Sequence, residues 1–533
     1  MFKNPSVQQH DFSHVPTANI QRSVFDRSHS YKTTMDADYL VPFYVDEAMP
    51  ADTHKMQSTI FGRLNTPIVP IMDNLHLDTF YFFVPYRLIQ DNFKKMMGEQ
   101  KNPSDSIAFT APSITGTWAT HSLQDYLGLP ISTPVTTTNY LGRAYNLIWN
   151  EWFRSESLQD SVVVDTDDGP DTAADYVLLK RGKRFDYFTS ALPWTQKGTA
   201  VSLPLGTSAP VLGIGIDNSN TGFPISNQDV RESDGTSSTY ALARQIGESN
   251  SNRYAYIEHQ TIAGANTPNI RADLSSATAA TINALRSAIQ LQAFYERDAR
   301  GGTRYVELVK SHFNVNDPEG LIQVRPIYLG GSSDSINIHP IAQTSGTSAS
   351  GTSTPLGNLA AMGTVVANSG FSKSFTEHGV VLGLMAVRAD LNYQQGLDKM
   401  FTRGLNGRFD FYFPSFANIG EQAIYNKEIY YQNTSDDDLV FGYNEAYADL
   451  RFKRNTITGL LRSNASGTVD IWHLAQKFTS LPTLNTTFIQ SSTDIDRVIA
   501  TPTQPHFVVD VYNKLSSVRA MPTWGVPASL LRL

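Results

Sequence analysis

The feature that most constrains the fold is a run of ten residues at positions 75–84, LHLDTFYFFV, which is apolar almost throughout. Successive side chains of a β-strand point to opposite faces of the sheet. One face of this run carries Leu75, Leu77, Thr79, Tyr81 and Phe83. The other face is nearly as apolar beyond Asp78. Since a strand with one wet face alternates apolar and polar residues, this run predicts a strand that is covered on both faces.

Similar apolar runs recur at residues 380–387, 408–413 and 506–512. If such distant runs share one sandwich, very long connections must join them, which favours a Greek-key or jelly-roll arrangement over a meander. A single core rarely grows beyond about 250–300 residues, so a chain of 533 residues holds either several cores or one core with large insertions. The recurrence of sandwiched strands along the whole length favours the second arrangement.

Two helices are expected between these strands. The longer one covers residues 281–300 and is ended by Gly301 and Gly302. Its apolar residues are Ile282, Leu285, Ile289, Ala293 and Phe294. A shorter helix is predicted at residues 140–153. The fold class is therefore mainly β with a few short helices.

Four segments are expected along the chain. Residues 1–35 are polar, with four Lys and Arg against two Asp, and form an N-terminal arm that needs another surface to lie on. Residues 36–197 and 281–533 supply the two parts of the sandwich and its loops. Residues 198–280 form an insertion rich in Gly, Ser, Thr and Asn. A second polar stretch, residues 332–363, is predicted to be a flexible loop.

The insertion at 198–280 has apolar anchors, among them Phe223, Tyr240, Tyr254 and Tyr256. It also lacks the charge density of a solvated tail. An ordered, loop-rich insertion is therefore favoured over a disordered linker, which stays an open alternative. Long structured loops commonly carry recognition, so these four aromatic residues are candidates for contacts with a receptor.

Charge is scarce in this chain. Asp, Glu, Lys and Arg make up 17% of the residues, against a typical value of about 25%. This composition indicates that much of the surface meets other protein. The net charge of −8 argues against a chain that condenses nucleic acid by itself, so any contact with nucleic acid is expected to be local.

Targeting and membrane signals are missing from the sequence. The longest apolar stretch, residues 380–387, is far short of the roughly 20 residues that a spanning helix needs. The first residues, MFKNPSVQQHDF, lack the apolar region of a secretory signal. The expectation is a protein that stays in the cytoplasm of the cell that makes it and does not insert into a membrane.

A search for catalytic motifs finds none. The sequence has no phosphate-binding loop, no zinc-protease motif and no nucleophile elbow, and it holds no cysteine. Residues 165–171, DTDDGPD, resemble a calcium loop only loosely, because Gly169 and Tyr176 occupy two ligand positions. A solvated acidic turn is the favoured interpretation. No enzyme activity, metal or cofactor is predicted.

Basic and aromatic residues alternate at residues 180–188, KRGKRFDYF. Lys180, Arg181, Lys183 and Arg184 stand beside three aromatic residues, a composition suited to single-stranded nucleic acid, in which phosphates are neutralised and bases stack. A solvated turn whose aromatic residues enter the core fits equally well. Residues 451–454 are a weaker case, for which an outward strand face is favoured. The dense charges of residues 296–304 fit the end of a helix.

Five segments resemble the major capsid protein of gokushoviruses, small tailless bacteriophages of the Microviridae with circular single-stranded DNA. They are DTFYFFVPYRL at 78–88, FTSALPWTQKG at 188–198, ERDARGGTRY at 296–305, YLGG at 328–331 and IGEQA at 419–423. They stand in the expected order, and the resemblance spans roughly residues 10–530. One departure is Thr195, where a second proline is expected.

The resemblance implies an eight-stranded antiparallel jelly roll with long inter-strand loops, assembled from copies of itself into a T=1 icosahedral shell around single-stranded DNA. It also implies that the insertion at 198–280 forms a protrusion at the threefold axes that is used in host attachment through a bacterial surface receptor. A small basic DNA-binding viral protein is a further implied partner. The protein would be a structural component of the virion, assembled in the host cytoplasm. The arm and the Lys180 to Arg184 cluster are then candidates for inner-surface or inter-subunit contacts.

Two other classes of protein remain as alternatives. Aromatic and Asn-rich loops on a β-sandwich also fit a carbohydrate-binding protein or a glycosidase, which would need two carboxylates beside the scissile bond. A bacterial adhesin is less favoured because the signal peptide is missing.

Overall fold

A computed structural model describes residues 21–201, 282–316, 324–342, 359–405 and 407–524, together with seven short strands between residues 211 and 272. The chain divides into two compact units. One combines residues 1–195 with residues 302–533, and the other is residues 196–301. Each unit is described by itself.

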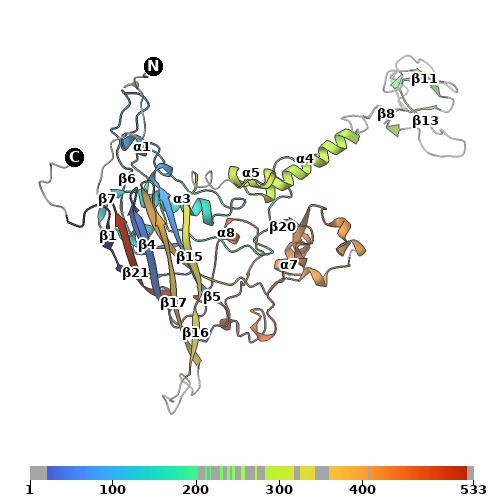
Figure 1. Ribbon diagram of the computed structural model, residues 1–533. Coiled ribbons are helices and arrows are strands. Elements are labelled where there is room, and N and C mark those ends of the chain that lie inside the picture. The colour runs from blue at the N-terminus through green and yellow to red at the C-terminus, as the bar shows by residue number, and fades with distance from the viewer. Residues whose placement is uncertain are drawn as a thin grey trace, which may run out of the picture. The chain divides into compact units, whose positions relative to one another are not determined.

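The first unit contains a large antiparallel sheet in the order β1-β21-β4-β17-β16, and β2 also pairs with β21 (Figure 1). Its strands are β1 (Ser23–Asp26), β2 (His29–Met35), β4 (Thr53–Leu64), β16 (Asn337–Ala342), β17 (Leu359–Ser374) and β21 (Phe507–Arg519). In the register of the central strands, Ile60 of β4 lies opposite Val511 of β21 and Ala367 of β17. The C-terminal strand is therefore an inner strand of this sheet.

A smaller antiparallel sheet has the order β15-β5-β18-β3. Its strands are β3 (Val41–Ala48), β5 (Leu75–Pro85), β15 (Ile327–Ser335) and β18 (Gly379–Ala389). In chain order, β2, β3, β4, β5, β15, β17, β18 and β21 build the sheets β2-β21-β4-β17 and β3-β18-β5-β15. This order is that of an eight-stranded jelly roll, so the predicted fold class is confirmed.

Both faces of the smaller sheet are covered. Leu77 and Tyr81 of β5 enter the core between the two sheets, whereas Phe82 and Val84 enter a second core on the other face. Strand β18 divides its side chains in the same way. The second core is completed by α3 (Tyr140–Ile148) and the π-helical turn that follows it (Trp149–Phe153). The predictions of strands apolar on both faces at 75–84 and 380–387 and of a helix at 140–153 are confirmed.

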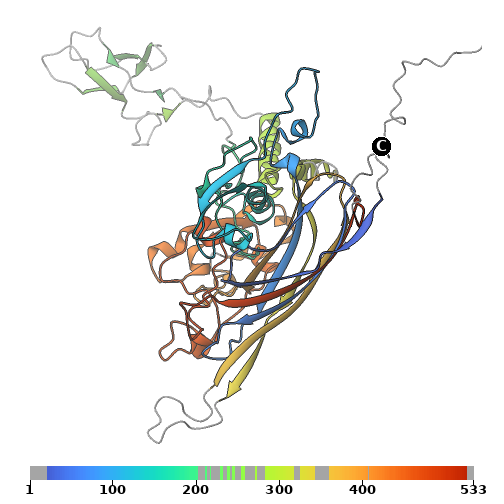
Figure 2. The same ribbon diagram turned by 90° about the vertical axis from the view of Figure 1, so that its left-hand side faces the viewer.

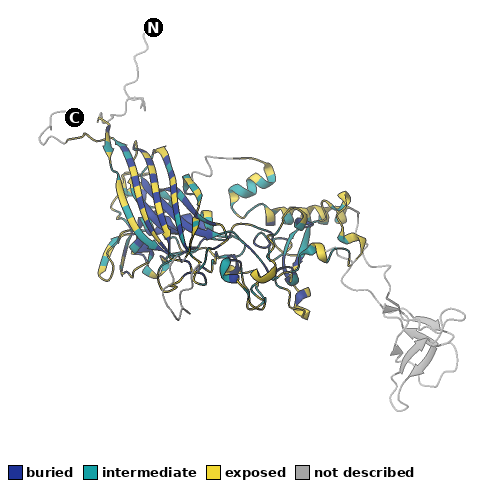
Figure 3. Cartoon of the chain, turned by 90° about the horizontal axis from the view of Figure 1, so that it is seen from below, coloured by how far each residue is buried: buried dark blue, intermediate teal, exposed yellow. Residues whose placement is uncertain are grey.

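The larger sheet has one buried and one exposed face. Strand β4 alternates strictly between exposed and buried side chains from His54 to Leu64, and β21 does so from Phe507 to Leu515. Figure 3 shows this alternation as bands of blue and yellow along the strands. Figure 2 shows the long strands of this sheet running beside one another. One face of the jelly roll is therefore open to solvent within a single chain.

Two long connections carry most of the remaining elements of the first unit. Residues 86–326 join β5 to β15, and residues 390–506 join β18 to β21. The first holds a 3-10 turn (Tyr86–Leu88), α1 (Phe93–Met96), β6 (Ser113–Thr117), α2 (Leu123–Tyr126), β7 (Pro134–Thr138), a 3-10 turn (Ala173–Asp175) and α5 (Tyr305–Phe313). The second holds β19 (Glu421–Tyr425), α7 (Asn426–Ile429), β20 (Val440–Glu445), α8 (Thr486–Ile489) and several 3-10 turns. No helix in the described part of the chain is long and apolar enough to span a bilayer.

The second unit contains short strands and one long helix. The strands are β8 (Val211–Leu212), β9 (Ile216–Asp217), β10 (Gln228–Arg231), β11 (Ser237–Tyr240), β12 (Ala243–Ile246), β13 (Tyr254–Glu258) and β14 (Arg271–Ala272). They pair antiparallel as β10-β11, β12-β13-β9 and β14-β8. The helix is α4 (Ile282–Arg300), which confirms the helix predicted at 281–300.

The strand predicted at residues 408–413 is wrong. Residues Arg408–Asp410 form a 3-10 turn, and the aromatic residues that follow are exposed. Gly407 before the run has a φ of 101°, and Pro414 follows it, so the backbone turns at both ends. A short apolar run therefore marks an exposed loop here rather than a sandwiched strand.

Two polar segments belong to the sheets. Residues 332–342 and 359–363, within the predicted flexible loop, lie in β15, β16 and β17, and residues 343–358 lie outside the described residues. The small residues of these segments allow neighbouring strands to pack closely. A Cβ on Gly363, for example, would lie only 2.7 Å from the Cβ of Leu64. In the predicted arm, residues 23–26 and 29–35 pair with β21 of the same chain, and residues 1–20 lie outside the described residues.

Candidate nucleic-acid interface

The basic segment at residues 180–188 is held in an extended form by backbone pairing on two sides. The amide of Arg181 donates to the carbonyl of Asp38 at 2.9 Å, and the amide of Lys183 donates to the carbonyl of Ile489 at 2.8 Å. Isolated β-bridges join Lys180 to Tyr39 and Gly182 to Gln490. This pairing points Arg181 and Lys183 inward, and both side chains are buried.

Arg181 belongs to a buried network centred on Asp78 of β5. Its guanidinium donates to the Asp78 carboxylate, and the Nε of Arg388 donates to the same carboxylate at 2.8 Å. Ser333 adds a third hydrogen bond at 2.6 Å. Burial works to raise the pKa of Asp78, but the hydrogen bond from Ser333 and the charges of Arg181 and Arg388 outweigh it and lower the pKa. The charge of Arg181 is therefore neutralised by a buried carboxylate and stabilises the fold.

Lys183 is buried against an aromatic ring. Its Nζ lies 4.4 Å from the centre of the Phe488 ring, and only 8% of the residue is exposed. Burial lowers the pKa of Lys183 to about 8, and the nearby charges of Asp186 and Asp38 oppose this shift. Neither Arg181 nor Lys183 offers its charge to solvent, so in a single chain neither can serve as an exposed phosphate contact.

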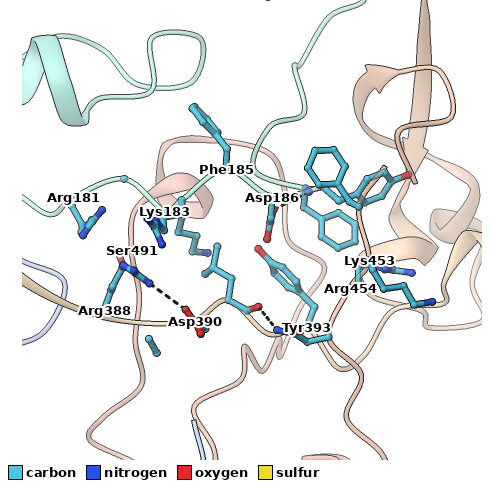
Figure 4. Close-up of a pocket in the computed structure, with 18 residues that line it drawn as sticks. Arg181, Lys183, Phe185, Asp186, Arg388, Asp390, Tyr393, Lys453, Arg454 and Ser491 are labelled. Carbon is cyan, nitrogen blue, oxygen red and sulfur yellow. Dashed lines mark hydrogen bonds and ion pairs between the residues drawn. The ribbon is translucent and has the colours of Figure 1, made fainter. Parts of the chain in front are cut away.

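A pocket of about 270 Å³ opens beside this segment (Figure 4). Residues 181–188 line one part of it, and residues 452–455 line another. In Figure 4, Arg181, Lys183 and Arg388 lie on one side of the pocket and Lys453 and Arg454 on the other. The two basic and aromatic segments that the sequence singled out separately therefore meet in one site. Residues 451–454 are not in a strand, contrary to the favoured interpretation.

The mouth of this pocket carries the groups that remain available. Arg184 and Lys453 are exposed, as are the rings of Phe185 and Phe452. Lys180 lines a separate cavity beside Asp36 and Asp38, where it is half-buried with its Nζ 5.2 Å from the Tyr39 ring centre. Two cations beside two open rings can hold a phosphate and stack a base. Of the four predicted cations, Arg184 is the one that lies exposed at this mouth. The described residues contain no cluster of three or more side chains that could hold a metal.

The predicted receptor residues are placed only in part. Tyr240 ends β11, and Tyr254 and Tyr256 lie in β13, which pairs with β12 and β9. Phe223 lies outside the described residues. The backbone thus brings Tyr254 and Tyr256 to one face of the same strand, because they are two residues apart. Their role in recognition stays a prediction.

An apolar surface that the sequence analysis missed lies in the second connection. We call residues 399–405 and 407–416 the aromatic loop. Within it Phe401 is 68% exposed, Leu405 78% and Phe409 63%. Other large exposed side chains of the loop are Met400, Phe411, Tyr412 and Phe413. Soluble monomers rarely expose so many large apolar side chains within one short segment, and exposed apolar patches mark sites of protein association.

The aromatic loop is held in place by polar contacts behind its exposed side chains. Arg403 pairs with Asp449, and the amide of Gly404 donates to the Asp410 carboxylate at 3.0 Å. The hydroxyl of Tyr447 donates to the carbonyl of Phe409 at 3.2 Å. The loop therefore presents its apolar side chains on a fixed scaffold. The density of aromatic residues at 408–413 was the available sequence signal, and it predicted a strand.

The acidic segment at 165–171 is not simply a solvated turn. Asp171 is buried and receives a bidentate pair of hydrogen bonds from Arg143 of α3, one of them at 2.8 Å. Asn139 donates to the same carboxylate at 2.5 Å. Arg143 also donates to the carbonyls of Ile89 and Asp167, each at 2.8 Å. The segment therefore anchors the long connection to the helix over the second core.

Comparison with known proteins gives consistent matches over almost the whole chain. A family model described as "Capsid protein (F protein)" matches residues 13–529. The protein "Capsid protein VP1" of Bdellovibrio phage phiMH2K is 45% identical and is covered over 98% of both chains. Proteins of the same description from Chlamydia phage 1 and Spiroplasma virus 4 are 42% and 34% identical, also over 98% of both chains.

Proposed function

The chain belongs to the capsid protein (F protein) family, and from this membership we propose that it is the shell subunit of a small phage that assembles with copies of itself into a T=1 icosahedral capsid. The resemblance to gokushovirus capsid proteins is confirmed by the relatives. The role of a capsid structural protein fits the jelly-roll fold. The protein is therefore a component of the virion, and we propose that it is made and assembled in the cytoplasm of the host bacterium.

The aromatic loop carries the proposal of self-assembly. Its exposed side chains include Phe401, Leu405 and Phe409, and burying one such side chain stabilises an interface by about 1.5–3 kcal/mol. Apolar surface of this kind is typical of the core of a lasting interface between subunits. In a closed shell each such contact is repeated by symmetry, so modest single contacts give a stable particle.

We further propose that the shell encloses circular single-stranded DNA. The exposed cations Arg184 and Lys453 and the open rings of Phe185 and Phe452 support a contact between the pocket mouth and the genome. The net charge of −8 leaves most of the phosphate charge unmatched, which supports a small basic viral protein as a further partner of the DNA.

Purified particles test this proposal directly. Treatment with nuclease before extraction is expected to leave circular single-stranded DNA of one length inside the particles. Digestion of the extracted DNA by a nuclease specific for single strands, and its resistance to an exonuclease, identify the form. Particles that protect no DNA, or that protect double-stranded DNA, would contradict the proposed cargo while leaving the shell role intact.

The insertion at 198–280 is proposed to form a surface protrusion that binds a bacterial receptor through residues that include Phe223, Tyr240, Tyr254 and Tyr256. Its own compact unit, residues 196–301, supports a separate role for this part of the chain. A jelly roll whose eight strands all lie outside the insertion does not require it for folding.

Replacing residues 218–266 by a short Gly-Ser linker is accordingly expected to leave particles intact and to abolish adsorption to the host bacterium. Sedimentation measures assembly, and loss of particles from solution after mixing with cells measures adsorption. Removal of residues 345–353, outside the insertion, serves as the control and is expected to leave both unchanged. If the first variant fails to assemble, the insertion belongs to the scaffold.

A carbohydrate-binding protein or glycosidase was the alternative from the sequence. Family membership favours the structural role, because the printed descriptions of the relatives are those of capsid proteins. We propose that the chain is not an enzyme and needs no cofactor. Binding of a surface glycan by the insertion would be compatible with the proposed attachment.

A further inference from the structure

The larger sheet presents an open face to solvent, formed by the outward side chains of its central strands and of β2. Those side chains are Ser30, Lys32, Thr34, Lys55, Gln57, Thr59, Phe61, Arg63, Val366, Asn368, Ser372, Val508, Asp510, Tyr512 and Lys514. The smaller sheet differs, since both of its faces are covered by apolar cores. The open face is thus a broad surface of the jelly roll that no other part of the described chain covers.

Two aromatic rings stand next to each other near the middle of this face. Phe61 of β4 is 48% exposed, and Tyr512 of the neighbouring β21 is 53% exposed. Phe61 lies opposite Asp510, so Tyr512 is its diagonal neighbour, at a Cα distance of about 7–8 Å. Sheets that bind single strands place aromatic rings on adjacent strands in this way and stack a base on each ring.

The charge of the open face is opposite to that of the whole chain. Lys32, Lys55, Arg63 and Lys514 stand against Asp510 and against Asp26, which lies on the edge strand β1 opposite Ser516. The formal charge is 4 − 2 = +2, whereas the chain carries −8. Asp510 is paired with Lys32 at 3.1 Å. Within the described residues, the other three cations form no ion pair. A cationic field with open rings complements the phosphates and bases of a nucleic acid.

The remaining residues of the open face argue against a second copy of the chain as the partner. Val366 and Val508 are apolar and more than half exposed, but Gln57, Thr59, Asn368 and Ser372 are neutral and polar. Thr59 donates to Asn368 across the strands at 2.9 Å. The cores of interfaces between subunits are apolar and depleted of lysine. The aromatic loop is rich in large apolar side chains, whereas the open face mixes a few apolar side chains with three lysines and several neutral polar residues.

We propose that the open face binds single-stranded DNA, with bases stacked on Phe61 and Tyr512 and phosphates held by Lys55, Arg63 and Lys514. This inference rests on the proposed enclosure of single-stranded DNA. It implies that the open face points toward the interior of the shell. It also assigns the genome a second contact beside the pocket mouth at Arg184 and Lys453.

Ultraviolet crosslinking of intact wild-type particles tests the placement without any mutation. After irradiation and digestion, mass spectrometry is expected to find nucleotide adducts on the peptides that contain Phe61 and Tyr512. Adducts confined to residues 181–188 and 452–455 would overturn the inference in favour of the pocket. Crosslinks from the open face to another protein segment would overturn it in favour of a protein partner. Particles that hold no DNA would instead overturn the proposed cargo.

A matched pair of variants tests the energetics on subunits released from particles, with labelled oligothymidylate as the probe. Tyr512→Ser combined with Lys55→Gln and Lys514→Gln is expected to weaken binding about tenfold and to reduce the slope of affinity against salt concentration, on logarithmic axes, by about 1.4. The control, Tyr305→Ser with Lys94→Gln and Lys101→Gln, removes the same groups from exposed positions elsewhere. Equal affinity and slope for both variants would overturn the inference. If the first variant does not fold, the crosslinking result decides.

Discussion

A chain in which Phe401, Leu405 and Phe409 are all replaced by serine is expected to fold and to remain unassembled. These side chains are between 63% and 78% exposed in the single chain, so the fold loses little when they are changed. In the shell they are proposed to be buried against a neighbouring copy. The loss of three such contacts weakens each interface by roughly 4–9 kcal/mol, which is enough to prevent assembly at ordinary protein concentrations.

Sedimentation of the variant measures assembly, and circular dichroism measures its fold. The control variant replaces Met72, Ile107 and Val163 by serine, because these three exposed apolar residues lie outside the aromatic loop. It is expected to form particles normally. A triple aromatic-loop variant that still yields particles of full size would show that the loop faces solvent or another viral protein in the shell.

A second large effect is expected at Asp171. Its replacement by alanine leaves the guanidinium of Arg143 buried, with 0% of its side chain exposed, and without its principal carboxylate partner. Breaking a buried ion pair from one side costs about 3–5 kcal/mol of folding free energy. Since the pair joins the segment at 165–171 to α3, the cost is expected to appear as loosening of the second core. Chemical denaturation of subunits measures it.

The control for this variant is Asp438→Ala, which removes a carboxylate that is 77% exposed and paired with Lys427. Its cost is expected to stay within about 1 kcal/mol.

Burial works to raise the pKa of Asp171, but the hydrogen bonds from Arg143 and Asn139 outweigh it, and the pKa lies below the ordinary value of 3.8. The contribution of Asp171 is therefore fully present above pH 3.8 and is lost as the pH falls through its folded pKa. The gap in stability between wild type and Asp171→Ala should shrink only in that acidic range, and a gap that shrinks near neutral pH would point to another group.

The sequence predicted those parts of the fold whose signal is local. Residues 75–84 and 380–387 were identified as doubly covered strands because period-2 patterning records the burial of both faces. Helix α4 was identified from its apolar spacing and its two terminal glycines. The order of the strands in the jelly roll could not be predicted from local patterning, because paired residues such as Ile60 and Val511 are far apart in the sequence. That order was predicted from the family resemblance alone.

The candidate site was less predictable, since its meaning depends on distant partners. Arg181 and Lys183 are residue types typical of a phosphate site, yet both are buried. Arg181 pairs with Asp78, and Lys183 packs against the ring of Phe488. Residues 408–413 have the composition of a buried strand, yet they are exposed because Gly407 and Pro414 turn the backbone away. In a subunit of a larger assembly, apolar residues serve both the core and the interfaces, and composition does not distinguish the two.

The position of β21 affects when the larger sheet can be completed. This strand is the last one in the sequence, and it lies between β4 and the N-terminal strands β1 and β2. While the chain is being synthesised, β4 therefore lacks one neighbour until residue 519 has left the ribosome. A chain truncated before β21 would leave an edge of β4 unpaired, and unpaired strand edges are sites of aggregation. The larger sheet is therefore completed only when nearly all of its strands have been synthesised.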